Sequence, residues 1–160
     1  MLDSDGNLTR ETLQVLDLVA EADVCIATGH LHIDEIRPLL DAANDRGIKK
    51  FLVTHANWAL CRLDLDVQRE LLSKGAFIEY VAISCVSPTF YEQNPTELAE
   101  WINALSDAKL VLTSDLGQFS AAPHPEGLRM IAATLLDLGI PFEVLERMMK
   151  STPAVLLGLE

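Results

Sequence analysis

The sequence predicts an α/β domain built on a parallel sheet, and two observations lead to this prediction. Short, nearly continuous apolar runs of strand length alternate with longer stretches whose apolar residues repeat at helical spacing. Strands that alternate with helices form parallel sheets through right-handed crossovers, so the pattern predicts four consecutive βα units. The 160 residues contain no linker or low-complexity stretch, and we therefore expect one domain spanning 1–160.

The first half of the chain predicts two helices and two strands. Residues 9–20 begin with a threonine suited to an N-cap and carry apolar residues at helical spacing. Residues 23–29 form an apolar run that is typical of a strand covered on both faces. Apolar residues then repeat at i, i+3, i+4 and i+7 from Ile36, and Gly47 is suited to end that helix. Residues 49–55 form the next predicted strand.

The second half of the chain continues this alternation and closes with two helices. Apolar spacing again distinguishes helices from strands, and a glycine follows two of the helices. The longest predicted loops, 84–95 and 115–127, both follow strands. In chain order, the predicted elements are a helix at 66–74, a strand at 76–84, a helix at 98–105, a strand at 109–115, a helix at 128–135 and a helix at 141–150.

Composition and charge exclude several classes of function. The net charge is -12 and no Lys/Arg cluster occurs, whereas nucleic-acid binding needs a basic face. No apolar run approaches the roughly 18 residues that span a membrane, and the first residues lack the features of a signal peptide. Three cysteines without CxxC spacing argue against a disulfide framework, so we expect a cytoplasmic protein of a reducing compartment.

Histidines and an aspartate follow the predicted strands. His30 and His32 come after the first strand, His55 ends the second, and Asp115 ends the fourth. The carboxyl ends of parallel strands meet at one edge of a sheet, so these side chains should lie in one neighbourhood. Imidazole nitrogens and a carboxylate are a typical ligand set for zinc, with manganese and iron as alternatives. The sequence therefore predicts a metal site, in which Asp115 is either a ligand or the base that takes a proton from water.

A structural interpretation of the same region stays open. A histidine at a strand end is often a hydrogen-bonded structural residue, and His32 fits equally well as a turn residue beside a helix cap at Asp34. Glu79, inside the third predicted strand, either faces the site or pairs with a lysine outside it. His124 and Trp58 follow strands, where they either line a substrate pocket or pack against their own loops.

Four short motifs resemble those of known metal-dependent hydrolases. The stretches "ATGH", "VTH", "LTSDLGQ" and "STPAVLLGL" are similar, in order and spacing, to the second half of amidohydrolases and phosphotriesterase-like proteins. The closest resemblance is to an uncharacterised amidohydrolase-like family. It implies a TIM-type (β/α)8 barrel in which His30, His55 and Asp115 bind the metal. Glu79 falls on a strand where the family pattern gives no fixed role.

The resemblance covers only the last four of the eight βα units of such a barrel. It therefore implies a parallel (β/α)4 half of a TIM-type (β/α)8 barrel, without the His-x-His pair that the first strand of the family supplies. The sequence "GHLH" would then replace that pair, with His32 as an additional ligand. A half barrel leaves two open strand edges, which favour association. We expect a homodimer or higher homo-oligomer in which two copies complete the barrel by two-fold symmetry.

These observations together predict a metal-dependent hydrolase with a small-molecule substrate. Water activated by the metal would attack an ester, lactone, amide or phosphoester, and Asp115 would orient that water or move its proton. Two alternatives stay open. One is a non-catalytic half barrel that acts as an assembly or binding module. The other, which is weaker, is a metal-independent lyase or isomerase that uses Glu79 as its base.

Overall fold

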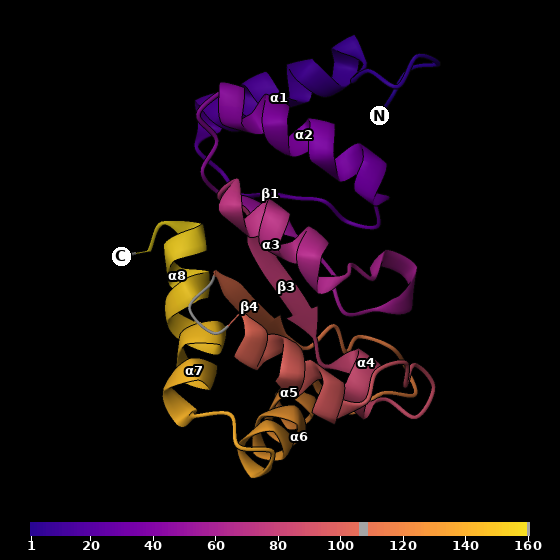
Figure 1. Cartoon of the computed structure of the whole chain (residues 1–160), viewed down its shortest axis with the longest axis vertical. Helices are drawn as coiled ribbons and strands as arrows, with labels where there is room; N and C mark the ends of the chain where they lie inside the picture. Colours follow the sequence, from indigo (N-terminus) through magenta and orange to yellow (C-terminus); the bar gives the residue numbers. More distant parts are fainter. Residues whose placement is uncertain (106–108, 160) are drawn as a thin grey trace.

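A sheet of four short strands organises the molecule, in the order β1-β2-β3-β4. Figure 1 labels three of these strands and shows the helices around them. The computed structural model describes residues 1–105 and 109–159. All three neighbouring strand pairs are parallel, which confirms the predicted α/β class and is compatible with half of a (β/α)8 barrel. The strands are β1 (Ile26–Ala27), β2 (Phe51–Val53), β3 (Phe77–Val81) and β4 (Leu110–Thr113).

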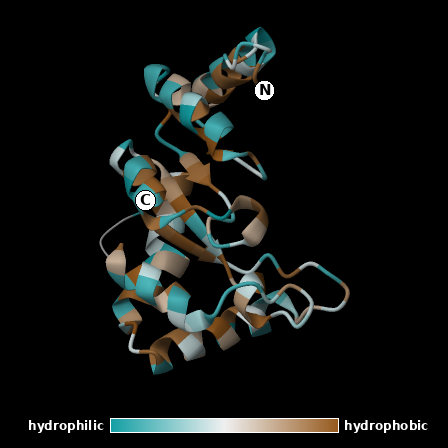
Figure 2. Cartoon of the chain, turned by 45° about the vertical axis from the view of Figure 1, so that its right-hand side comes forward, coloured by the Kyte–Doolittle hydropathy of each residue, from teal (hydrophilic) through white to brown (hydrophobic). Residues whose placement is uncertain are grey.

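One face of the sheet is covered by helices whose apolar residues form the main core. Phe51, Ile78 and Leu112 on this face pack with apolar residues from every one of these helices. Figure 2 shows strands that are largely hydrophobic and helices that carry many hydrophilic residues. The long helices that contribute to this core are α1 (Arg10–Ala22), α2 (Ile33–Asp45), α3 (Leu65–Ser73), α5 (Pro95–Ala104) and α6 (His124–Asp137). Cys85, Leu145 and Met148, from shorter helical segments, also belong to it.

The opposite face is covered only in part. Phe77 and Val111 on this face pack against Leu156, which lies on the last helix, α8 (Thr152–Leu157). Ala27 on β1 is exposed, although its register with Leu52 and Phe77 places it on the same face. The shorter elements are η1 (Ala59–Cys61) after β2, α4 (Ile83–Val86) after β3, and α7 (Phe142–Glu146) and η2 (Arg147–Ser151) before α8.

Several local predictions are confirmed. Thr9 is the N-cap of α1, and its hydroxyl oxygen accepts the backbone N–H of Thr12 at 3.3 Å. Gly47 follows α2 in the left-handed region with φ 74°, as expected of a glycine that ends a helix. None of the helices in the described part of the chain combines the length and the apolar composition needed to cross a membrane.

The third predicted strand is too long. β3 ends at Val81, and Ile83 already belongs to α4. The ladder of β3 with β4 stops at the pair Val81 and Thr113, although the N–H groups of Ala82 and Ile83 still donate to the carbonyls of Thr113 and Ser114 at 2.9 and 3.1 Å. The carbonyls of the same two residues already accept helical hydrogen bonds, as in the 3.0 Å contact from the N–H of Val86 to the carbonyl of Ala82.

Two helix boundaries near the end of the chain are also wrong. α6 begins at His124, which is therefore not a loop residue as predicted, because prolines at 123 and 125 are compatible with the first helical turn. The helix predicted at 141–150 continues to Leu157 through the π-helical turn η2. Pro153 follows this turn, and a proline lacks the N–H that an ordinary α-helical turn would use.

Candidate functional site

The carboxyl ends of three strands turn sharply out of the sheet. Gly29 after β1, His55 after β2 and Asp115 after β4 have φ values of 59°, 57° and 50°. A left-handed conformation is accessible to glycine but costs energy for histidine and aspartate. Strained residues of this kind are concentrated at functional sites, because only surrounding contacts can hold them. The left-handed residues therefore lie at the same edge of the sheet at which the sequence places the candidate site residues.

His55 and Asp115 form the centre of the candidate site. His55 Nε2 lies 3.6 Å from Asp115 Oδ2, and the two side chains are only 16% and 33% exposed. The other ring nitrogen of His55, Nδ1, is buried and has no hydrogen-bond partner among the described residues. A buried imidazole nitrogen without a partner is costly, so other contacts of His55 must offset the free-energy cost of holding it there.

His30 and Trp58 lie beside this pair. The ring centroid of His30 is 4.9 Å from that of His55 and 5.6 Å from that of Trp58. Trp58 also lies 5.7 Å from His55, and its other neighbour, Phe90, is 6.4 Å away. The structure thus places His30 beside His55, and His55 beside Asp115, and it places Trp58 against both histidine rings.

Glu79 faces the site and not a lysine. One carboxylate oxygen accepts the backbone N–H of His55 at 3.3 Å, and the other accepts the hydroxyl of Thr113 at 3.0 Å. The carboxylate therefore links the ends of β2 and β4 from the strand between them. Burial raises the pKa of Glu79 above its ordinary value, the hydrogen bond from Thr113 and the two interactions with His55 oppose the rise, and the nearby Asp115 adds to it.

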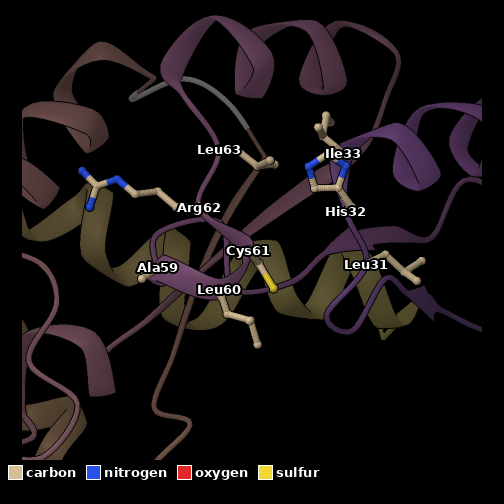
Figure 3. Close-up of a pocket in the computed structure, with 8 residues that line it drawn as sticks. All are labelled: Leu31, His32, Ile33, Ala59, Leu60, Cys61, Arg62 and Leu63. Carbon is tan, nitrogen blue, oxygen red and sulfur yellow. The ribbon is translucent and has the colours of Figure 1, made fainter.

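His32 lies apart from His55 and Asp115, at the beginning of a helix (Figure 3). It is the N-cap of α2, where its Nδ1 accepts the N–H of Asp34 at 3.4 Å and the carboxylate of Glu35 accepts the His32 N–H at 3.2 Å. The cap is thus His32 itself and not Asp34, which corrects that detail of the prediction. The His32 side chain is 71% exposed and engages the helix terminus, so the structure does not bring it to His55 and Asp115.

His124 is tied to the strand that carries Asp115. Its Nδ1 forms a 2.7 Å hydrogen bond with the hydroxyl of Ser114, which is buried. This contact joins the first residue of α6 to the end of β4. His124 thus holds the residue that precedes Asp115 and is not part of the ring cluster around His55.

Sequence reasoning missed the threonines that hold the strand ends. The hydroxyl of Thr54 donates to the carbonyl of Gly29 at 2.6 Å, and the backbone N–H of Thr54 donates to the Thr28 hydroxyl at 3.1 Å. Thr113 holds Glu79 in a similar way. A usable signal was present, because "ATG", "VTH" and "LTS" place one threonine at the end of each of these strands.

A buried amide network also positions Trp58. Asn57 Oδ1 accepts the N–H of Val81 at 2.8 Å, and its Nδ2 donates to Ser84 Oγ at 2.8 Å and to Gln93 Oε1 at 3.0 Å. Asn57, Ser84 and Gln93 are all buried. The loop after β2 is thereby fixed to the end of β3, and Trp58 is held against the histidines. No periodic pattern in the sequence identifies such a network, because its members lie far apart along the chain.

The donor types at the site fit a divalent metal ion. Two ligands held about 2.0–2.1 Å from a tetrahedral ion lie about 3.4 Å apart, close to the 3.6 Å between His55 Nε2 and Asp115 Oδ2. Within the described residues, no group of three or more His, Cys, Asp or Glu side chains is already arranged to hold an ion. His30, which is exposed beside His55, is the side chain that could complete a three-ligand set.

Comparison with known proteins identifies one similar family. Residues 1–79 match the model of a family of unknown function, DUF6282. The matched segment includes His30, His32 and His55 and stops at Glu79, before Asp115. No curated protein and no solved structure matches the chain.

Proposed function

We propose that the chain is a metal-dependent hydrolase that acts on a small-molecule ester, lactone, amide or phosphoester. The observation that supports this proposal is the pair of His55 and Asp115. Both residues have a left-handed backbone at the carboxyl end of a strand, and their side chains are spaced for a shared ion. The motif resemblance to amidohydrolases supports the same reaction class.

His55 and Asp115 would hold the ion, with His30 as the third ligand. A bound divalent ion such as zinc, or alternatively manganese or iron, lowers the pKa of water and polarises a carbonyl or phosphoryl oxygen. Asp115 is only partly buried, so its second carboxylate oxygen can accept a proton from the attacking water. Trp58 lies edge-on against the two histidine rings and limits the access of bulk water to His55, whereas His30 stays exposed.

We further propose that a second copy completes a (β/α)8 barrel. β1 and β4 each have a single strand neighbour in the described sheet, so both edges can accept another strand. Exposed apolar residues accompany both edges: Val15 and Leu18 on α1, and Val155 and Leu157 on α8. A two-fold axis would place β1 of one copy beside β4 of the other, with all strands parallel. We assign the protein to the cytoplasm, where free thiols such as Cys25 and Cys61 are stable.

The test is the metal content per chain, measured by plasma mass spectrometry on untagged protein purified without chelator. We expect near-stoichiometric zinc, manganese or iron in the wild type. His55→Ala should weaken metal binding by more than about 100-fold, since even the loss of an outer partner costs 10–100-fold. Hydrolysis of an ester, lactone and phosphotriester panel should be lost with the metal.

His32→Asn is the matched control, because asparagine is also a good N-cap. It should keep the metal of the wild type. Full metal retention and activity in His55→Ala would disprove the mechanism. A wild type that takes up no metal, even on reconstitution, would instead favour the non-catalytic assembly or binding module.

A further inference from the structure

The first turn of α6 contacts both chain neighbours of Asp115. His124 Nδ1 lies 2.7 Å from the hydroxyl of Ser114, which precedes Asp115. Gly127, three residues further along the same helix, lies directly against the side chain of Leu116, which follows Asp115. Residues three apart in a helix share one face, so His124 and Gly127 form one surface against the end of β4.

Leu116 occupies the space that a side chain at position 127 would need. A Cβ atom added to Gly127 would overlap the Cδ1 of Leu116 and would lie 3.3 Å from its Cγ. Gly127 is also buried inside α6, where a glycine destabilises a helix relative to an alanine. The residue that costs helix stability is thus the one that lets the chain beside Asp115 pack against the helix.

Leu116 has little room to move aside. It is only 3% exposed and belongs to a small buried cluster of aliphatic side chains. The other buried members of this cluster are Val81 and Ile83. Trp58, which contacts the histidine rings, packs against the same cluster. Because protein interiors are close-packed, an additional methyl group at position 127 would force Leu116 and its backbone to shift.

The backbone of Asp115 needs such contacts. Its φ of 50° is unfavourable for a residue with a Cβ atom, so the surrounding structure must maintain it. The 3.6 Å between the Asp115 carboxylate and His55 Nε2 exceeds the usual hydrogen-bond distance. The contacts of Ser114 and Leu116 with α6 can therefore fix the backbone of Asp115 from both sides.

We propose that His124 and Gly127 are positioning residues of the candidate site. Through Ser114 and Leu116, they hold Asp115 in the left-handed conformation that directs its carboxylate into the site. The part of this inference that concerns metal binding rests on the proposed function, because it takes Asp115 as a ligand. The part that concerns the backbone of Asp115 does not depend on any ion.

The first test measures the backbone of Asp115 in the metal-free protein by NMR. A left-handed residue holds its amide and α protons close together, so Asp115 should give a strong intraresidue cross-peak in a nuclear Overhauser spectrum. Gly127→Ala should displace Leu116 and weaken this cross-peak at least about twofold. Leu135→Ala, which shortens a buried side chain near the other end of α6, is the control for lower stability and should leave the cross-peak strong.

The second test measures the affinity for cobalt(II), from its visible absorption, in a double-mutant cycle. Gly127→Ala should raise the Kd for cobalt(II) at least about tenfold, as expected when a residue that orients a ligand is changed. Leu116→Ala should also raise this Kd. Adding Gly127→Ala to Leu116→Ala should then cost no more than about twofold, because the methyl group occupies space that the leucine has left.

His124 is tested in the same assay with a conservative pair of variants. His124→Ala removes the hydrogen bond to Ser114 and should raise the Kd for cobalt(II) at least about threefold. His124→Asn can keep this hydrogen bond and should restore the affinity of the wild type. Wild-type affinity in His124→Ala would overturn the role of His124.

A wild-type cross-peak and wild-type cobalt(II) affinity in Gly127→Ala would overturn the proposal, and so would equal losses with and without Leu116. If Gly127→Ala does not fold, Leu116→Ala is compared with the double variant, and a weaker Asp115 cross-peak in the double variant would contradict the contact. A protein that binds no cobalt(II), but whose Asp115 cross-peak weakens in Gly127→Ala, would refute the proposed function and leave the positioning of Asp115 in place.

Discussion

At the scale of single residues, the candidate site depends on two non-glycine residues in left-handed backbone conformations. His55 and Asp115 have φ values of 57° and 50°, where the Cβ atom crowds the following carbonyl. Glu79 offsets part of this cost at His55 by accepting its backbone N–H. The fold therefore maintains local strain in order to present an imidazole and a carboxylate at one point.

This strain leads to a prediction for Asp115. Both Asp115→Gly and Asp115→Ala remove the carboxylate, but only glycine relieves the left-handed backbone. The Gly variant should be more stable than the Ala variant by about 0.5–1 kcal/mol. This difference is the strain energy that glycine relieves, minus the free-energy cost of the additional backbone entropy that glycine loses on folding. Urea unfolding measures this difference, and both variants should bind metal poorly. Equal stabilities of the two variants would show that the backbone at 115 is not strained.

Glu79 should make the stability of the metal-free protein depend on pH. Its pKa is raised in the folded state, chiefly by burial, so folding favours the protonated carboxyl. The stabilisation by this group is full below its unfolded pKa and is lost as the pH rises through the raised, folded pKa. The free energy of unfolding of the wild type, minus that of Glu79→Gln, should therefore fall as the pH rises above the ordinary value of 4.5.

Glu79→Gln is a suitable reference for this measurement because its amide can keep contacts to the His55 N–H and the Thr113 hydroxyl. Glu79→Ala removes both contacts and should be less stable than Glu79→Gln at every pH. A stability difference between wild type and Glu79→Gln that stays constant from pH 4 to 8, or that grows with pH, contradicts the raised pKa.

At the scale of secondary-structure elements, the turns that end the strands explain why the strands are short. β1 and β2 contain two and three residues, because Gly29 and His55 turn the chain out of the sheet. Side chains then fix each turn: Thr54 holds the loop after β1, and Asn57 holds the loop after β2. The helix after β1 depends in turn on its cap, which is a histidine.

The cap leads to a prediction for α2. His32→Ala removes the side-chain acceptor for the N–H of Asp34 and should cost about 0.5–2 kcal/mol of stability. His32→Ser should restore the loss, because a serine hydroxyl is an effective N-cap. Thermal and urea unfolding of both variants measure this. Loss of bound metal in His32→Ser, with the stability restored, would show instead that His32 is a ligand.

At the scale of the whole molecule, the described sheet has two open edges and one incompletely covered face. Leu156 of α8 covers Phe77 and Val111, whereas Ala27 at the β1 side is exposed on the same face. Exposed apolar side chains beside β1 and near the end of the chain add surface that water solvates poorly. A second copy that pairs the two edges would cover these surfaces together.

The proposed dimer leads to a prediction for α1. Sedimentation velocity should show a species with twice the mass of one chain, and Leu18→Lys, which places a charge at the proposed edge, should weaken the dimer at least about tenfold. Ser73→Lys adds the same charge on α3, which packs over the middle of the sheet, and should leave the dimer unchanged. A strictly monomeric wild type at micromolar to millimolar concentration would contradict the closed barrel.

Much of the fold and part of the site can be predicted from short-range patterns. Apolar runs and helical spacing predict the alternation of strands and helices, because each pattern reports which face of one element is buried. The parallel sheet is then a consequence of chain topology. His30, His55 and Asp115 gather at one edge for the same reason, since the carboxyl ends of parallel strands all lie there.

The sequence by itself determined the fold class and the edge of the sheet at which the candidate site forms. Only the tertiary structure decided that Glu79 faces His55, that His32 caps a helix, and that Trp58 lies against the rings of His30 and His55. The physical reason is that these features depend on side-chain direction after a strand has ended. That direction is set by left-handed turns and by hydrogen bonds between residues far apart in the chain, which no local periodicity records.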